Sequence, residues 1–151
     1  MSLEGTSAAT EALDRLGVQD LYSRYCFAMD ASDGAGLADC FTEDGIFDIV
    51  GRKRFEGRDA IRNLVANTAG QRPRHVWVNL MIRRCTAGTA DSASYFLVIN
   101  HETGAITGYG EYRDESIKGP DGVWRFRNRV VDFKWQSGEN AARTARVAAE
   151  N

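Results

Sequence analysis

The stretch "RPRHVWVNL" at residues 72–80 marks the point where a helix-like sequence becomes strand-like. Pro73 disfavours a helix, and the β-branched and aromatic residues that follow it are typical of strands. Three further apolar runs come after it, separated by Gly- and Asp-containing segments of the kind that form hairpin turns. The pattern therefore predicts four antiparallel strands, at about 74–86, 90–101, 105–117 and 122–135.

The sequence before Pro73 favours helices. Apolar residues at helical spacing, among them Leu13 and Leu16, predict a long first helix that ends at Asp30, with a kink or break at Gly17. Two short helices, in "SDGAGLADCF" and "GRDAIRNLVANTAG", flank two short strands in "GIFDIVG" and "RKRFEG", and "GRKRF" at 51–55 reads as an exposed turn. Helices first and strands later indicate an α+β fold, with helices over one face of a long curved sheet. A curved sheet with helices over its concave side leaves a cone-shaped space, which can enclose a ligand.

The last predicted strand, "VWRFRNRVVDFKW" at 123–135, changes its alternation midway. Its first aromatic residues occupy even-numbered positions, whereas the later apolar residues are odd-numbered, so a regular strand cannot bury both sets on one face. The change indicates a bulge near 128–130 or a sheet whose buried face changes along its length, and either could turn Arg127 or Arg129 inward. The other interpretation is that Arg125, Arg127 and Arg129 form a solvated row.

Length and composition indicate one domain, which we place at residues 1–136, followed by a polar tail at 137–151. The tail reads as a frayed helix or an oligomer contact. A net charge of −2 over 151 residues gives no strong field for nucleic acid, and no apolar run is long enough to span a membrane. Three cysteines without metal spacing fit reduced thiols, so we expect a cytoplasmic protein.

Few residues in this sequence could do chemistry. Asp30 lies where the first helix should end. A negative charge there interacts unfavourably with the helix dipole, so an aspartate at this position suggests a role that offsets the lost stability. His75, one of only two histidines, opens the first long strand, and Tyr25 lies five residues before Asp30. Each also has an ordinary structural interpretation: an exposed turn aspartate, an end-of-strand histidine and a core tyrosine. His101 lies in a predicted turn, which favours exposure.

One face of the strand that starts at His75 is mixed, as a pocket wall should be, because it carries Trp77 and Asn79 beside the histidine. The opposite face is aliphatic, and we expect it to pack in the core. No zinc-ligand spacing, P-loop, GxGxxG or GxSxG motif is present, so we expect neither a metal nor another cofactor. Aromatic residues elsewhere in the chain would complete a hydrophobic wall, among them Phe41, Phe47 and Phe96.

Six segments occur in the order typical of the SnoaL-like branch of the nuclear-transport-factor-2-like superfamily, and they span about residues 12–135. They are "YxxxxD" at 25–30, "LADCFTEDGIFDIVG", "FEGRDAIRNLV", "RHVWVNLMI", "ASYFLVI" and "DGVWRFRNRVVDF". The sequence resembles in particular the scytalone dehydratase-like members, which include bile acid 7α-dehydratase and hexachlorocyclohexane dehydrochlorinase. The resemblance implies a cone-shaped α+β barrel, with N-terminal helices packed on a strongly curved mixed sheet around one pocket.

The resemblance also implies roles for individual residues. In those enzymes an Asp at the end of the first long helix lies beside a His at the start of a strand, and Asp30 and His75 match these positions. Tyr25 matches a tyrosine of the bile acid dehydratase, and Arg129 resembles an arginine that the dehydrochlorinase uses. We therefore predict Asp30, His75 and Tyr25 as catalytic. The predicted substrate-binding residues are Arg129, Asn79, Trp77, Phe47, Phe41 and Phe96.

The expected function is that of a cofactor-independent acid–base lyase of the dehydratase type, acting on a small hydrophobic hydroxylated or keto ring compound. The alternatives on the same fold are a polyketide cyclase, a ketosteroid-type isomerase, and a non-catalytic ligand-binding or assembly module resembling a ring-hydroxylating dioxygenase β-subunit. The resemblance further implies a homo-oligomer, with a trimer favoured over a dimer. We expect no nucleic-acid or membrane partner.

Overall fold

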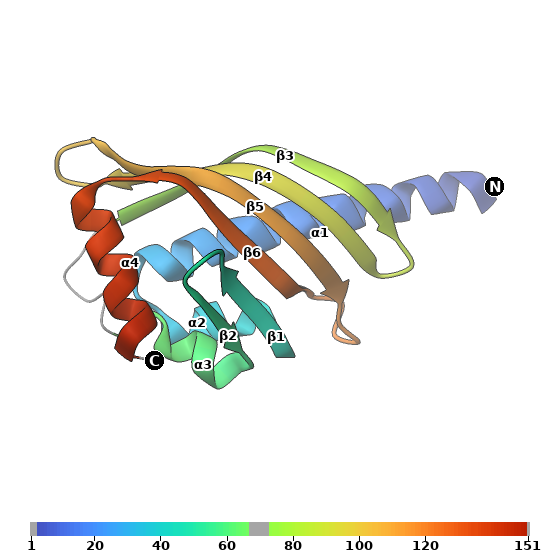
Figure 1. Cartoon of the computed structure of the whole chain (residues 1–151). Helices are drawn as coiled ribbons and strands as arrows, with labels where there is room; N and C mark the ends of the chain where they lie inside the picture. The colour runs from blue at the N-terminus through green and yellow to red at the C-terminus, as the bar shows by residue number, and fades with distance from the viewer. Residues whose placement is uncertain (1–2, 67–72, 151) are drawn as a thin grey trace.

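Figure 1 shows the fold of the chain, a computed structural model that describes residues 3–66 and 73–150. A long helix, α1 (Leu3–Asp30), precedes the short helix α2 (Gly34–Asp39), the strands β1 (Phe41–Ile49) and β2 (Lys53–Glu56), and the short helix α3 (Arg58–Asn63). Four long strands follow, β3 (Pro73–Thr86), β4 (Thr89–Asn100), β5 (Ile106–Lys118) and β6 (Trp124–Gln136), and the last helix is α4 (Gly138–Glu150). The ends of the long strands agree with the predicted ranges to within two residues.

The six strands form one mixed sheet in the order β2-β1-β6-β5-β4-β3. β1 and β6 are parallel, and every other neighbouring pair is antiparallel. The sheet is strongly curved: α1 lies across its concave side, α2 and α3 lie beside β1 and β2, and α4 stands at one end (Figure 1). The fold is therefore the predicted α+β cone, with its interior between the sheet and the helices.

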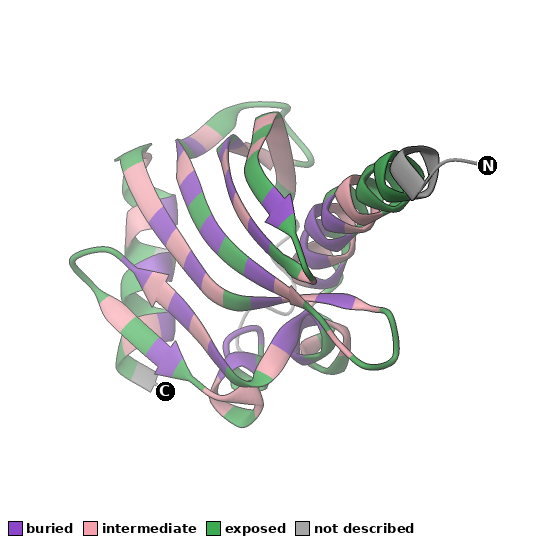
Figure 2. Cartoon of the chain, turned by 90° about the vertical axis from the view of Figure 1, so that its right-hand side faces the viewer, coloured by how far each residue is buried: buried purple, intermediate pink, exposed green. Residues whose placement is uncertain are grey.

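Helix α1 is uninterrupted, so the predicted break at Gly17 is wrong. Gly17 instead serves packing: a Cβ there would lie 2.5 Å from Cδ1 of Trp124, so the absence of a side chain lets the indole lie against the helix. The apolar stripe that predicted the helix is buried only in its later turns, because Leu13 and Leu16 are 68% and 59% exposed. The turns of α1 around these two leucines extend beyond the sheet and are mostly exposed, as Figure 2 shows.

A bulge in β6 decides which of its side chains face the core. The pairing of β6 with β5 skips Arg127, so that Phe126 and Arg129 are both buried while Arg127 is exposed. The predicted bulge is therefore present, one residue before the predicted range, and the interpretation of the arginines as one solvated row is wrong. Burial then continues on the odd-numbered positions, as at Val131.

The polar tail forms helix α4, which packs against the sheet. The side-chain amide of Asn140 donates a hydrogen bond to the backbone oxygen of Thr107 at 3.1 Å. Lys53 donates from Nζ to the backbone oxygen of Ala148 at 2.8 Å, which places a positive charge at the C-terminal end of α4. The prediction of an exposed turn at 51–55 is therefore correct only for Gly51 and Arg52, because Lys53 begins strand β2 and binds the last helix, and Phe55 is buried.

Candidate active site

Asp30, the last residue of α1, lies in contact with His75 near the start of β3. The Nδ1 atom of the His75 ring is 2.7 Å from Oδ1 of Asp30, and the two side chains are only 7% and 12% exposed. A carboxylate that accepts a hydrogen bond from Nδ1–H fixes the ring tautomer and stabilises the imidazolium. The second ring nitrogen, Nε2, is then available as a base.

The backbone of β3 explains why an aspartate ends α1. β3 is an edge strand, and the backbone N–H of His75 donates to Asp30 instead of to a neighbouring strand, at 3.0 Å from Oδ1 and 3.3 Å from Oδ2. One carboxylate thus binds both the backbone and the ring of the histidine. These charge-assisted hydrogen bonds offset the cost of a negative charge at a helix C-terminus.

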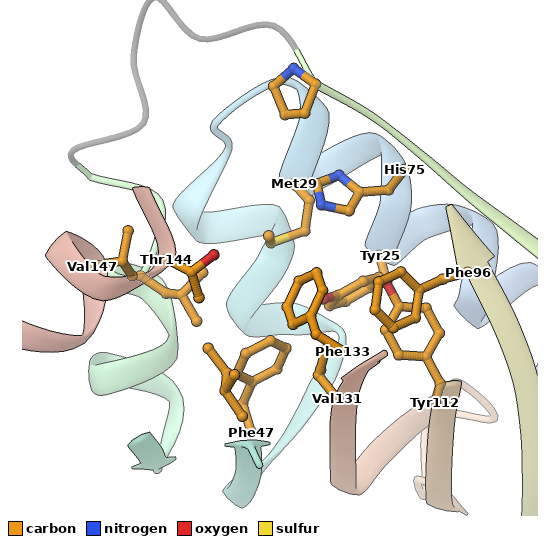
Figure 3. A pocket seen from close by; sticks show the side chains of 13 residues that line it. Tyr25, Met29, Phe47, His75, Phe96, Tyr112, Val131, Phe133, Thr144 and Val147 are labelled. Atoms are coloured by element: carbon orange, nitrogen blue, oxygen red, sulfur yellow. The ribbon is translucent and has the colours of Figure 1, made fainter. Parts of the chain in front are cut away.

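His75 lines a cavity of about 60 Å³ that lies between α1, the sheet and α4 (Figure 3). Among the described residues, the polar side chains that line this cavity are His75, Tyr25, Tyr112 and Thr144. The other described lining residues are apolar, so the base faces a space that favours a hydrophobic ligand. These apolar residues include Met29, Phe47, Leu64, Phe96, Phe133 and Val147.

Tyr25 and Tyr112 lie next to each other in the cavity wall. Their ring centroids are 6.0 Å apart at an interplanar angle of 80°, and each residue is only 1% exposed. Burial raises the pKa of both phenols well above the usual value, because the charged form is desolvated. Near neutral pH both hydroxyls are therefore protonated and can donate a hydrogen bond or a proton. The catalytic role of Tyr25 stays a prediction.

Arg129 is fully buried but is not among the residues that line the cavity. Its guanidinium donates from Nε to Oδ1 of Asp114 at 2.9 Å and from Nη2 to Oδ2 at 2.7 Å, and both side chains are 0% exposed. The predicted place of Arg129 in the pocket wall is therefore wrong, because aromatic rings cover its guanidinium. The rings of Tyr22, Tyr25, Tyr112 and Phe126 lie 3.9–4.6 Å from its Cζ.

Asn79 is exposed, so its predicted place in the pocket wall is also wrong. β3 has one extra residue relative to β4 between Val78 and Met81, and Asn79 adopts a φ of 54° in this bulge. Asparagine tolerates this left-handed conformation better than most residues. The bulge reverses the alternation of the strand, so that Leu80 and the following aliphatic residue, Ile82, pack against the core.

The remaining predicted residues divide between cavity and core. Phe47 and Phe96 line the cavity, as predicted. Phe41 is fully buried in the core and does not line the cavity, so its predicted place is wrong. The Trp77 ring packs edge-on against Tyr22, at 5.8 Å between centroids, and is likewise not a lining residue. His101 is exposed in the turn after β4, as its turn sequence indicates.

The sequence did not predict the contribution of α4 to this site. Thr144 and Val147 line the cavity from that helix. The Thr144 hydroxyl donates to the backbone oxygen of Asn140 at 2.9 Å and accepts from Nε2 of Gln136 at 3.0 Å, so its one O–H donor is already used. The one signal in the sequence was an isolated valine among alanines and polar residues in the tail, a pattern that fits a helix with one apolar face.

The other groups considered for chemistry are the cysteine thiols and possible metal ligands. Burial raises the pKa of Cys26 to about 12 and that of Cys40 to about 11, so both thiols are protonated and unreactive near neutral pH. Within residues 3–66 and 73–150, no group of three or more His, Cys, Asp or Glu side chains is placed to hold a metal ion. In the same ranges, no helix is long and apolar enough to cross a membrane.

The chain belongs to the SnoaL-like domain family, whose family model matches residues 10–130. No curated protein matches the chain. Among solved structures, it is similar to Rv3472, a protein of unknown function from Mycobacterium tuberculosis. That similarity has a TM-score of 0.78 and 30% identity, and it covers 94% of this chain and 88% of that one.

Two further structures have the same fold at lower identity. A scytalone dehydratase-like protein from Novosphingobium aromaticivorans has a TM-score of 0.76 and 23% identity, over 86% of this chain and 90% of that one. LinA, a dehydrochlorinase, has a TM-score of 0.71 and 24% identity, over 84% of this chain and 92% of that one. At these identities the two similarities show the shared fold.

Proposed function

We propose that this chain is a cofactor-independent acid–base lyase of the dehydratase type, acting on a small hydrophobic ring compound that carries hydroxyl and keto groups. The observation that carries the proposal is the 2.7 Å contact between Asp30 and a His75 ring that lines an apolar cavity. The scytalone dehydratase-like and dehydrochlorinase neighbours support an elimination reaction on this fold.

The proposed reaction removes water across two neighbouring carbons. Nε2 of His75 takes a proton from the carbon next to the keto group, and the electrons of that C–H bond form the new double bond. The hydroxyl on the next carbon leaves with its bonding electrons and takes a proton from Tyr25, so that water departs. Asp30 stabilises the imidazolium meanwhile. Proton transfer from the imidazolium to the Tyr25 phenolate, through the released water, restores both groups.

The cavity sets the expected substrate class. The described lining residues include no Asp, Glu, Lys or Arg, and His75 meets the substrate as a neutral base, so an ionised substrate would lose its hydration without gaining a charged partner. Proton transfer by a positioned side chain contributes about 10²–10⁴-fold in rate. Orientation in the cavity and stabilisation of the developing charge on the keto oxygen must supply the remainder.

A panel of uncharged ring compounds with a hydroxyl two carbons from a keto group tests the proposal. Ligand-detected NMR first identifies the compounds that bind, and each bound compound is then incubated with the protein in D₂O for product mass measurement. We expect at least one bound compound to lose one water. His75→Ala should abolish the conversion, whereas His101→Gln, at the exposed histidine, should leave it unchanged.

The other outcomes of this experiment decide against the dehydratase. A product of unchanged mass that carries deuterium would point to an isomerase that uses the same base. A cyclised product of unchanged mass would favour a cyclase. Bound compounds that remain unconverted, or a panel in which nothing binds, would contradict the proposal and favour a non-catalytic module.

A further inference from the structure

Arg129 lies directly behind the two tyrosines of the cavity wall. Its Cζ is 4.1 Å from the ring of Tyr25 and 4.0 Å from the ring of Tyr112, and both tyrosines line the cavity (Figure 3). The guanidinium is fully buried, so no bulk water screens its charge at this distance. A cation over an aromatic face attracts the π electrons, which withdraws electron density from the phenol oxygen.

The ion pair with Asp114 does not use all of the guanidinium's hydrogen-bond donors. Asp114 binds the guanidinium through Nε and Nη2, whereas Nη1 has no hydrogen-bond partner among the described residues. A buried ion pair is seldom the best way to stabilise a core, because well-packed apolar residues of similar volume are often as stable or more so. A role outside stability therefore accounts better for a sealed arginine at the back of the cavity.

Arg129 acts to lower the pKa of the Tyr25 phenol, which is the direction expected of a residue that polarises the hydroxyl. Burial raises the pKa of the Tyr25 phenol, and Arg129 is the largest influence that opposes this rise; Asp114 acts in the same direction as burial, but less than Arg129 acts against it. Burial thus keeps the phenol protonated, while the arginine makes its O–H more polar. The Tyr22 ring centroid also lies 4.6 Å from Cζ of Arg129, but its hydroxyl is paired with Ser92 Oγ at 3.1 Å, and Tyr22 does not line the cavity.

We propose that Arg129 is a positioning residue of the candidate active site that acts through the Tyr25 ring, where its fixed charge strengthens the hydroxyl as a hydrogen-bond donor to a substrate oxygen. Tyr112, at the same distance from the guanidinium, is subject to the same effect. The inference rests on the proposed function only in taking the acceptor to be an oxygen of the substrate. The polarisation itself requires no knowledge of the reaction.

Replacement of Tyr25 by 3,5-difluorotyrosine provides a direct measurement, because fluorine brings the ionisation of the phenol into an accessible pH range. Its absorbance is titrated in the otherwise native chain and in the double variant Arg129→Met, Asp114→Leu, which removes both buried charges together. Because the influence of Arg129 exceeds that of Asp114, the phenol pKa at position 25 should rise by roughly 1–3 in the double variant. Difluorotyrosine at exposed Tyr109 is the matched control and should not shift.

A second variant tests the opposite direction and does not depend on the first one folding. Asp114→Asn keeps a hydrogen-bonding partner of the same shape but leaves the guanidinium charge unopposed, so the phenol pKa at position 25 should fall. Circular dichroism and thermal unfolding establish that each variant is folded. An unchanged pKa at position 25 in either folded variant, or a rise in Asp114→Asn, would overturn the inference.

The titration separates this inference from the proposed function. Failure to find a dehydratase substrate would leave the predicted pKa shifts in place, whereas absent shifts would leave the Asp30–His75 proposal untouched. On a substrate found by the panel, the double variant should lower kcat by about 10-fold or more, since a positioned donor to a developing oxyanion is worth up to about 10²–10³-fold. KM should change little, and Arg129→Lys should restore part of kcat. Full kcat in the folded double variant would count against the inference.

Discussion

Within the described residues, the part-buried Asp30–His75 pair and the fully buried Asp114–Arg129 pair each join a carboxylate to a basic side chain, and they differ in what each leaves available. Asp30 binds His75 at 2.7 Å, and the histidine ring also lines the cavity. Asp114 binds Arg129 at 2.7 Å, with both side chains 0% exposed and aromatic rings over the guanidinium. The first pair faces space that a ligand can enter, whereas the second is sealed inside the core.

The chemistry of the two basic groups makes this difference matter. An imidazole exchanges its proton near neutral pH, whereas a guanidinium stays protonated in proteins. The Asp30–His75 pair can therefore move a proton, and the Asp114–Arg129 pair can supply only a fixed field. Burial alone thus does not identify a catalytic pair; access to a cavity and a group that titrates are also needed.

The largest expected effect is the loss of turnover when the accessible pair is broken. On the substrate found by the panel, His75→Ala and Asp30→Asn should each lower kcat/KM by about 10²–10⁴-fold, because the base or its orientation is lost. Steady-state kinetics measure this effect, and His101→Gln is the control at an exposed histidine. Activity close to that of the native chain in either folded variant would rule out the pair as the catalytic base.

The stability of the fold should depend more on the sealed Asp114–Arg129 pair than on the Asp30–His75 pair. Arg129→Ala leaves the Asp114 carboxylate buried without its partner, so the free energy of unfolding should fall by about 3–5 kcal/mol. Asp30→Asn keeps an oxygen that can accept the backbone N–H of His75, and it should cost only about 1 kcal/mol. Urea denaturation of the two variants measures the contrast. A larger loss of stability in Asp30→Asn than in Arg129→Ala would reverse the distinction between the two pairs.

A smaller effect should follow from loosening α4, which covers the cavity but not the sealed pair. Lys53→Ala removes the ammonium that binds the backbone oxygen of Ala148, so amide exchange in α4 should become about fivefold faster, which corresponds to about 1 kcal/mol. Hydrogen–deuterium exchange measures this rate. Arg54→Ala is the matched control, because Arg54 pairs with exposed Glu56 on the same strand. Equal exchange rates in the two variants would show that Lys53 does not hold the helix.

The smallest effect near neutral pH should come from the buried thiols, and it should grow at alkaline pH. The pKa of Cys26 is about 12 in the fold against about 9 when exposed, so above pH 9 the unfolded chain binds fewer protons than the folded one. The stability from burying the neutral thiol is complete below that pH and is lost as the pH rises towards 12. Urea denaturation at about pH 8 and about pH 10 should show a smaller decrease for Cys26→Ala than for the native chain. An equal decrease would exclude the thiol as a contributor.

Much of the fold could be predicted because its signals are local. Pro73 and the Gly- and Asp-containing turns placed the four long strands, and the change of alternation in 123–135 indicated the bulge that turns Arg129 inward. The features that were missed depend on tertiary contacts. The Gly17 prediction failed because Trp124 packs against α1 at that point, and the contribution of α4 depends on its hydrogen bonds with residues of β2, β5 and β6.

The predictions for the candidate site also succeeded for some residues and failed for others. Asp30 and His75 were paired through the family resemblance, and their contact follows from a helix end beside an edge strand. Asn79 was misplaced because one extra residue in β3 reverses the alternation, and the only local sign of it is the asparagine itself, a residue that tolerates the left-handed conformation. The catalytic roles, the cytoplasmic location and the homo-oligomer stay predictions.

The tautomer of the His75 ring tests the central claim most directly, because it needs no substrate. Long-range ¹H–¹⁵N NMR distinguishes a protonated from an unprotonated ring nitrogen, and exposed His101 is an internal reference in the same spectrum. At a pH where the ring is neutral, we predict a proton on Nδ1, facing Asp30, and a free lone pair on Nε2; Asp30→Asn should weaken this preference. A His75 ring protonated mainly on Nε2, or a tautomer ratio that Asp30→Asn leaves unchanged, would contradict the Asp30–His75 base.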